Sequence, residues 1–311
     1  MRKLIIGAFA VMAVMASSAS SQAQTIGVAL ASDTNPFYIA MLKGMRIEAG
    51  KLGYKISVVT ANSDVAKQLD GVNDLIAKKV DAILISPIDA KALCSAFNKA
   101  KSAGVPMMSI ARGSACKSQL LHVAMDEKKI GREIAAWTAK KIGGKGKVAM
   151  IAGPAGAATF RNLAQGYESV MAKHPGVKVV YKHNVLLTRE NGLKQGEDIL
   201  VAHPDIAAIY GANDELALGA MQAAKAAGKN KSVVITGMNG VPPAVRAVAR
   251  GNLDMTVALN PVAWGMLGIK TAKRVMAGDM PKHGVYLNHL LVDSSNGAGL
   301  WKMMKARRKK K

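Results

Sequence analysis

Apolar and polar positions follow two alternating rhythms along this chain. Short apolar or β-branched runs predict strands at residues 25–30, 55–60, 82–86, 105–110, 121–125, 147–152, 177–185, 207–211, 233–237 and 255–259. Longer stretches with helical spacing of apolar residues predict helices at 37–52, 65–79, 90–103, 128–142, 157–173, 191–202 and 214–227. Alternating strands and helices favour βαβ units, and strands that are apolar throughout are typical of parallel sheets covered on both faces.

Ten strands exceed one comfortable open sheet, and the rhythm restarts near residue 147 after a first set that ends near 125. We therefore predict an α/β fold of two doubly wound parallel-sheet lobes that face each other across a cleft. Several predicted helices end at a glycine, a common helix stop, at Gly53, Gly104, Gly143 and Gly228. In open α/β sheets, ligands bind beyond the carboxyl ends of the strands.

The amino terminus carries the features of an export signal. Arg2 and Lys3 precede an apolar run at residues 4–16, and a small, polar stretch follows. This order is typical of a secretory signal peptide, and we place cleavage after Ala23. The run of about 13 residues is shorter than the roughly 20 that span a bilayer as a helix. We expect residues 1–23 to be removed and the mature protein to reside in the periplasm.

Net charge is strongly positive, with 43 Lys and Arg against 20 Asp and Glu, or +23. Nine of the basic residues lie in the two ends, so the body of the chain is itself basic at +14. Residues 301–311 form a tail with seven basic residues and no acidic one, which predicts a solvated, disordered segment. Membrane-surface or nucleic-acid binding by the tail is the less favoured interpretation, because no stacking aromatics are interleaved with the charges. We expect no nucleic-acid partner.

Cys94 and Cys116 are the two cysteines of the chain. In an exported protein such a pair predicts a disulfide, and two buried free thiols are the alternative. Neither cysteine has a histidine or carboxylate cluster beside it, so we expect no metal and no cofactor.

Polar and aromatic residues follow several predicted strands where the cleft should lie. Asn35 and Pro36 mark a helix start, and Phe37 and Tyr38 come next, either as core residues or as packing for a ligand ring. Later loops add Arg112, Arg161, Asn213 and Asn239. These side chains form hydrogen bonds but include no paired acid and base. Ser114 has no evident histidine partner, so the sequence favours binding over catalysis.

Four segments in order resemble the periplasmic sugar-binding proteins of ABC importers, close to the ribose-binding type. They are Asn35-Pro36-Phe37-Tyr38, Ser86-Pro87-Ile88-Asp89, residues 155–161 and residues 213–220, and the resemblance spans about residues 25–293. It implies the type I periplasmic binding protein fold and ligand contacts at Asn35, Phe37, Tyr38, Arg112, Arg161 and Asn213.

The resemblance also implies a domain plan. The first lobe would comprise residues 24–125 with 260–286, and the second 126–259 with 287–300, so that three hinge segments join them. We expect a monomer that closes on a small-molecule ligand and presents it to a membrane permease. A sensory co-receptor that presents ligand to a chemoreceptor or sensor kinase is an alternative with the same fold. A repressor of this superfamily would need a helix-turn-helix where the signal peptide stands.

Departures from the ribose-binding pattern bear on the ligand. That pattern has Asp at the positions of Ala111 and Asn239, an aromatic residue at Leu187 and Gln at Leu259. Two carboxylates are therefore absent while both arginines remain. One hypothesis is a small neutral sugar or polyol, which the resemblance favours. The other is an anionic sugar acid whose carboxylate would pair with Arg112 or Arg161.

Overall fold

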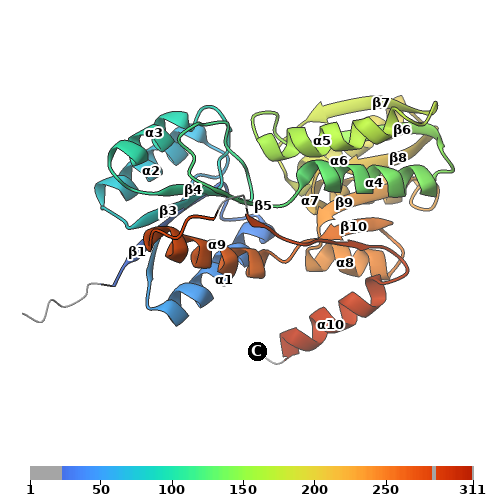
Figure 1. Ribbon diagram of the computed structural model, residues 1–311. Coiled ribbons are helices and arrows are strands. Elements are labelled where there is room, and N and C mark those ends of the chain that lie inside the picture. Colours follow the sequence, from blue (N-terminus) through green and yellow to red (C-terminus); the bar gives the residue numbers. More distant parts are fainter. Residues whose placement is uncertain (1–22, 282–284, 310–311) are drawn as a thin grey trace, which may run out of the picture.

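The structure, a computed structural model, describes residues 23–281 and 285–309 and has two lobes side by side (Figure 1). Most of the predicted signal peptide, residues 1–22, lies outside the described residues. The first lobe contains β1 (Thr25–Leu30), α1 (Pro36–Leu52), β2 (Lys55–Thr60), α2 (Val65–Ala77), β3 (Ala82–Ile85), α3 (Cys94–Ser102), β4 (Met107–Ile110), β5 (His122–Ala124), α9 (Pro261–Met276) and β11 (Val285–Tyr286).

The second lobe is built in the same way. It contains α4 (Glu127–Lys141), β6 (Lys145–Ala152), α5 (Ala158–Met171), β7 (Gly176–Asn184), α6 (Arg189–Ala202), β8 (Ile206–Gly211), α7 (Asp214–Ala226), β9 (Val234–Asn239), α8 (Pro242–Ala249), β10 (Met255–Ala258), β12 (Leu290–Val292) and α10 (Gly297–Lys309). The chain passes between the two sheets after β5, after β10 and after β11.

Each lobe holds a six-stranded sheet. The strand orders are β11-β5-β4-β3-β1-β2 and β12-β10-β9-β8-β6-β7, and every pairing is parallel except that of β12 with β10. The two orders correspond strand for strand, and the order reverses at β1 in one sheet and at β6 in the other. The predicted fold class, two doubly wound α/β lobes, is confirmed.

Local sequence signals account for most element boundaries. All ten predicted strands are present within a few residues of their expected ends. Gly53, Gly104, Gly143 and Gly228 each adopt a positive φ, between 67° and 74°, within two residues of a helix end, where a side chain would be strained. Asn35 caps α1 by accepting a hydrogen bond from the Phe37 backbone nitrogen at 3.0 Å.

Some elements differ from the expectation. Helices α8 and α9 and the short strands β11 and β12 were not among the predicted elements. The prediction that the tail is disordered is wrong up to residue 309, because α10 includes these residues of the tail. A Lys305 ammonium lies 5.8 Å from the Trp301 ring centre one turn away, a contact that only the helix creates.

Close glycine contacts bring together the helices that carry the cleft residues. A Cβ on Gly44 of α1 would lie 1.9 Å from the Val262 carbonyl oxygen, and one on Gly265 of α9 would lie 2.0 Å from the Met41 carbonyl oxygen. Reciprocal glycine contacts of the same kind join α4 to α5 and α6 to α7, at Gly131, Gly166, Gly192 and Gly219. The helix backbones therefore approach closely, and this fixes the helix starts that line the cleft.

The predicted disulfide between Cys94 and Cys116 is present within the first lobe. It closes a loop of 22 residues, which restricts the unfolded chain and stabilises the fold by roughly 3 kcal/mol in the chain-entropy model. Replacing both cysteines by serine should lower the free energy of unfolding by about that amount in a denaturant titration. Ligand affinity should not change, and an unchanged unfolding midpoint would contradict this role.

Candidate ligand-binding cleft

The carboxyl ends of the strands of both sheets border a cleft between the lobes. An inner cavity of about 30 Å³ lies beneath a wider mouth of about 300 Å³, and Asn35, Tyr38, Arg112 and Leu187 line both. The inner cavity is lined by Asn35, Phe37, Tyr38, Ala111, Arg112, Met125, Thr159, Phe160, Leu187, Met238, Asn239, Leu259 and Trp264. Eight of the ten predicted ligand-binding positions are therefore gathered in one place.

The start of α1 supplies the aromatic wall. Phe37 packs edge-to-face against Tyr38 and Trp264, with ring centres 5.4 and 5.5 Å apart. The Tyr38 hydroxyl lies 2.9 Å from the Ser86 Oγ, and Trp264 donates to the Val123 carbonyl at 3.1 Å. Phe37 and Tyr38 are thus both core residues and part of the cavity wall. The two interpretations of these aromatics, core packing and packing against a ligand, are therefore compatible.

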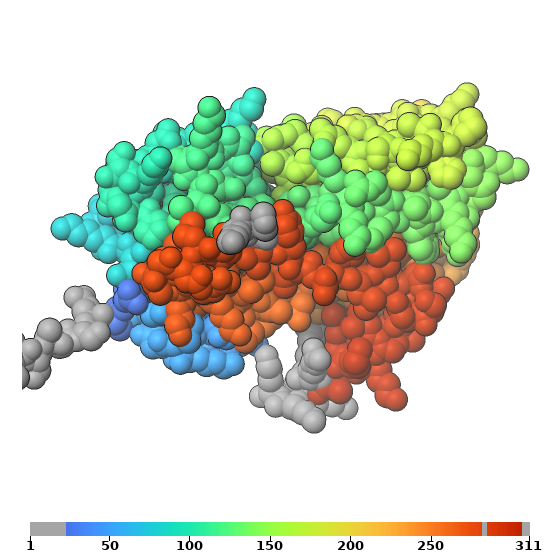
Figure 2. Space-filling view, viewed as in Figure 1, coloured from blue at the N-terminus to red at the C-terminus, as the bar shows by residue number. Residues whose placement is uncertain are grey.

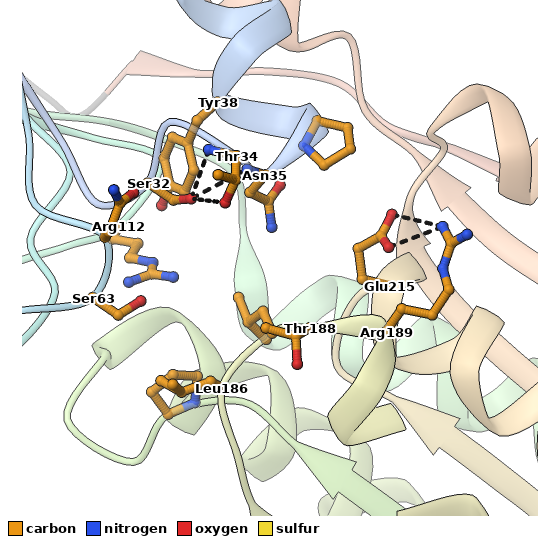
Figure 3. A pocket seen from close by; sticks show the side chains of 14 residues that line it. Ser32, Thr34, Asn35, Tyr38, Ser63, Arg112, Leu186, Thr188, Arg189 and Glu215 are labelled. Atoms are coloured by element: carbon orange, nitrogen blue, oxygen red, sulfur yellow. Dashed lines mark hydrogen bonds and ion pairs between the residues drawn. The ribbon is translucent and has the colours of Figure 1, made fainter. Parts of the chain in front are cut away.

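Arg112 places a buried positive charge at the centre of the cleft. The residue is 5% exposed, and its guanidinium carbon lies 5.7 Å from the Tyr38 ring centre and 5.2 Å from that of Phe160. Among the described residues it forms no ion pair with a carboxylate. Both rings stabilise the cation, and Figure 3 shows the guanidinium pointing toward the cleft. Its planar N–H donors are therefore available to acceptors of a ligand.

Two predicted site residues stand elsewhere. Arg161 lines neither the inner cavity nor the mouth, and its Nη1 donates to the Ala155 carbonyl at 2.6 Å within its own lobe. Asn213 is buried and caps α7 by accepting from the Leu216 nitrogen at 3.0 Å. Its Nδ2 is a buried donor without a hydrogen-bond partner in the described part of the chain.

Asp214, next to Asn213, holds the loop that carries Asn239. Its carboxylate accepts from the Val241 nitrogen at 2.8 Å and from the Thr256 hydroxyl at 2.6 Å. Complete burial raises the pKa of Asp214 to about 7, although these hydrogen bonds oppose the rise. Asn239 itself has a φ of 126°, a backbone conformation that this network keeps in place.

The mouth of the cleft has its own ion pair. Arg189 donates to Glu215 at 2.9 and 3.1 Å, and both residues belong to the second lobe (Figure 3). Asn35 lies across the mouth, with its amide nitrogen directed into the cleft in the same view. Because Glu215 is already paired, Arg112 has no carboxylate partner there.

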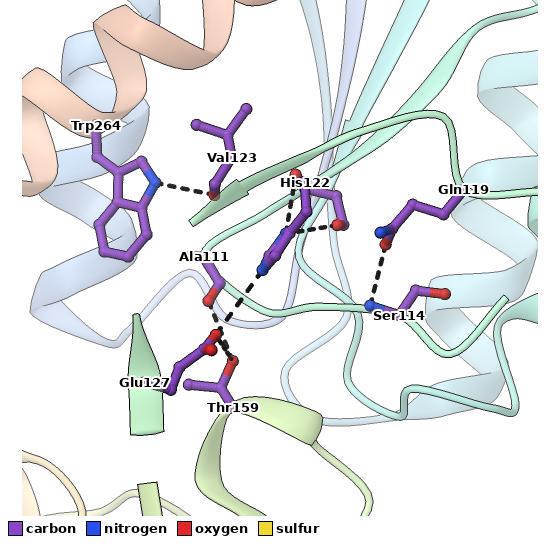
Figure 4. Close-up of polar contacts among 9 residues, drawn as sticks. Ala111, Ser114, Gln119, His122, Val123, Glu127, Thr159 and Trp264 are labelled. Carbon is purple, nitrogen blue, oxygen red and sulfur yellow. Dashed lines mark hydrogen bonds and ion pairs between the residues drawn. The ribbon is translucent and has the colours of Figure 1, made fainter. Parts of the chain in front are cut away.

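Polar contacts join the lobes behind the cavity. Thr159 of α5 donates to the carbonyl of Ala111 in the first lobe at 3.2 Å and lies 3.3 Å from Glu127 (Figure 4). Glu127 is 3.8 Å from His122, whose other ring nitrogen contacts the Ser109 Oγ at 2.7 Å. Ala111 has a φ of 64°, so the loop before Arg112 is held in a strained conformation at a contact between the lobes.

A second bridge is formed by segments that the sequence analysis singled out as motifs. The Ala90 nitrogen of the first lobe donates to the Gly156 carbonyl of the second at 3.0 Å. A Cβ on Gly156 would lie 2.1 Å from the Asp89 Oδ2. The space-filling view shows the lobes touching along their facing edge (Figure 2). Asp89 and Gly156 therefore lie at the contact between the lobes, whereas Thr159 and Phe160 of the second motif line the inner cavity.

The sequence analysis missed Thr159, Phe160 and Trp264. Phe160 precedes Arg161 directly, so the correct helix start was found but the neighbouring residue faces the cavity. Trp264 follows Asn260-Pro261, the same cap as Asn35-Pro36, and Asn260 accepts from the Ala263 nitrogen at 3.1 Å. That repeated pair was the signal that could have located α9.

Comparisons with known proteins show which family has this architecture. The family model described as the periplasmic binding protein domain matches residues 26–280. The chain belongs to the periplasmic binding protein family. The ribose import binding protein of Haemophilus influenzae is 34% identical over 286 residues, which cover 90% of this chain and 95% of that protein. The ribose import binding protein of Bacillus subtilis is 35% identical over 254 residues, or 82% of each chain.

Among solved structures, an ABC transporter solute-binding protein from Mycobacterium smegmatis with bound glycerol aligns with a TM-score of 0.86 and 30% identity. The alignment covers 90% of this chain and 97% of that one. The family and these relatives are solute-binding proteins, so this chain is a binding protein and not an enzyme, as its sequence predicts, and its family is periplasmic.

Arg112 and Arg161 offer a direct comparison of two predicted contacts. We expect Arg112→Ala to weaken ligand binding by at least about tenfold, because a charge-assisted hydrogen bond contributes roughly 1.5–3 kcal/mol. Arg161→Ala should have the smaller effect if the ligand-bound cleft keeps the arrangement seen here. Isothermal titration of both variants measures this. A greater loss in Arg161→Ala would mean that Arg161 turns into the cleft on binding, as the sequence analysis predicted.

Substitution of Gly156 tests whether contact between the lobes supports ligand binding. Gly156→Ala should weaken affinity several-fold, because its methyl group meets an Asp89 side chain that is fixed by hydrogen bonds from the Lys91 and Ala92 nitrogens, each at 2.8 Å. Less of the closed form would then be populated. Adding Asp89→Ala to Gly156→Ala should restore affinity. Equal affinities in all three proteins would show that closure tolerates a wider gap there.

Proposed function

We propose that this chain captures a small sugar or polyol between its lobes and delivers it to the membrane permease of an ABC importer. The observation that carries the proposal is the donor set of the cleft. The Arg112 guanidinium and the amides of Asn35 and Asn239 surround an aromatic and aliphatic cavity at the carboxyl ends of two sheets. The relatives support it, since their names record ribose import and one solved neighbour holds glycerol.

The proposed cycle uses the three connections as a hinge. The lobes would be residues 24–125 with 260–286 and residues 126–259 with 287–300, with residues 1–23 removed on export. An open form admits the ligand, and closure brings Phe160 against Arg112 and Thr159 against the Ala111 carbonyl. The permease then recognises the closed shape. This cycle requires one protein chain and no cofactor.

The size of the cleft favours a small ligand. Ordinary small-molecule pockets have volumes of roughly 300–1,000 Å³, whereas the inner cavity measures about 30 Å³. A bound sugar would therefore fill the inner cavity and extend into the mouth. Leu187, Leu259 and Met238 contribute no hydrogen-bonding side chain, so a ligand with few hydroxyl groups fits this wall better than a hexose does.

One observation favours a second class of ligand. Arg112 is buried without a carboxylate partner among the described residues, and a buried charge is costly unless it is paired. The carboxylate of a sugar acid would supply that partner. The neutral ligand remains the proposal, because the cation already has two aromatic faces and the relatives named above take neutral compounds.

A thermal-shift comparison distinguishes the two classes. The protein lacking residues 1–23 is melted with each neutral sugar or polyol and with its acid counterpart, for example a pentose and the matching pentonate. A ligand that binds the folded form stabilises it by mass action, by about 2.7 kcal/mol when the ligand concentration is a hundred times Kd. The melting temperature rises as a result. We expect the neutral members to raise it and Arg112→Ala to lose the rise. A rise with acids alone would assign the acid class, and no rise with either would contradict carbohydrate binding.

A further inference from the structure

Helix α10 presents a basic surface that the ligand cleft does not use. Its residues Leu300, Met303 and Met304 line a groove of about 490 Å³ beside the connections between the lobes. The helix runs to Lys309, and residues 301–311 of the sequence include seven basic residues and no acidic one. Figure 1 shows α10 at the edge of the second lobe beyond α8, with the carboxyl terminus at its free end.

The first turn of α10 is fixed to the body. A Cβ on Gly297 would lie 2.8 Å from the Val248 side chain of α8. The preceding turn is held by Asp293, which accepts from the Trp137 ring nitrogen at 2.9 Å, and by Asn296, which donates to the Leu291 carbonyl at 2.8 Å. The helix therefore has a defined direction where it leaves the lobe.

Further along α10, several side chains are exposed. Lys302, Met303 and Lys305 are exposed, and Met303 retains 55% of its accessible surface. Within the described residues, neither lysine forms an ion pair. In Figure 2 the red carboxyl-terminal residues form the lower margin of the second lobe. Lys302 and Lys305 are thus exposed cations that no carboxylate of the described residues neutralises.

We propose that α10 is a docking element for an anionic phospholipid surface. A helix that combines several Lys and Arg residues with Trp and Met has the composition of an interfacial helix. Each basic residue close to an anionic bilayer strengthens binding by about fivefold. Trp301, held against Lys305, belongs at the polar–apolar boundary of a bilayer, where tryptophan is enriched.

A lipid surface fits these observations better than a nucleic acid does. The basic segment contains a single aromatic residue, Trp301 at its start, so it has no series of stacking platforms for bases. Met303, which retains 55% of its accessible surface, has no role in phosphate-backbone contact but suits the apolar side of a bilayer interface. Docking by α10 would hold the binding protein beside the membrane that contains its permease, and it does not depend on which ligand occupies the cleft.

Vesicle sedimentation tests the proposal with the protein lacking residues 1–23, because the predicted signal segment would itself bind lipid. Vesicles of phosphatidylcholine alone are compared with vesicles in which about one third of the lipid is phosphatidylglycerol. The protein should sediment with the anionic vesicles at low salt and be released at high salt. Equal binding to both vesicle types, or none to either at low salt, would overturn the proposal.

Matched charge variants locate the effect. The triple variant Lys302→Gln, Lys305→Gln, Arg308→Gln should bind anionic vesicles about a hundredfold more weakly. The control variant Lys91→Gln, Lys101→Gln, Lys117→Gln removes the same charge from exposed positions of the first lobe and should bind as the parent does. Equal losses in the two triples would attribute binding to net charge and refute a role for α10.

Tryptophan emission and competition complete the test. Anionic vesicles should shift the emission of the parent protein to shorter wavelength, and Trp301→Phe should abolish the shift. Tighter binding to duplex DNA than to anionic vesicles at the same salt would replace the lipid with a nucleic acid. The ligand-induced rise in melting temperature should be the same in the parent and both triples, which separates this proposal from the function of the cleft.

Discussion

The guanidinium of Arg112 lies against one aromatic ring from each lobe, and the cleft is organised around it. Tyr38 comes from the first lobe and Phe160 from the second, at 5.7 and 5.2 Å from the guanidinium carbon. A buried cation without a carboxylate partner is expensive in an apolar setting. Two ring faces reduce that cost, but the second face is present only when the lobes are together. In the proposed cycle, closure would therefore complete the environment of the charge that faces the ligand.

The contacts around the cavity likewise depend on residues from both lobes. Thr159 donates to the carbonyl of Ala111, the residue before Arg112, so the loop that carries the arginine is held from across the cleft. The Gly156 carbonyl accepts from Ala90 near the outer edge, where a side chain at Gly156 would meet Asp89. These polar contacts between described residues of the two lobes are local, so a ligand that adds hydrogen bonds inside the cleft would shift the balance between the proposed open and closed forms.

Much of this arrangement follows from local sequence rules. The apolar runs predict the strands, and helix caps such as Asn35-Pro36 place polar residues at the carboxyl ends of the sheets. Sequence alone could not orient Arg161, because whether Phe160 or Arg161 faces the cavity depends on the rotation of α5. That rotation is set by its close backbone contacts with α4 at Gly131 and Gly166, which are tertiary. Trp264 was missed for a similar reason, since α9 returns to the first lobe only after the chain has crossed twice.

At two positions of this cleft, a strained backbone conformation coincides with a side chain that affects ligand selectivity. Ala111 and Asn239 have φ values of 64° and 126°, and the sequence analysis expected carboxylates at both positions in a protein of the ribose-binding pattern. Asn tolerates a positive φ better than Ala does, so Ala111 retains the strained loop without a side chain that compensates for it. The loop is instead fixed by Thr159 and by the packing of Arg112. Ala111 offers a ligand no side-chain acceptor, so hydroxyl groups close to it must be recognised by other residues. Selectivity in such a cleft then depends on the donors and the apolar wall of the inner cavity, and on polar side chains of the mouth such as Ser32 and Thr188 where the ligand extends into it.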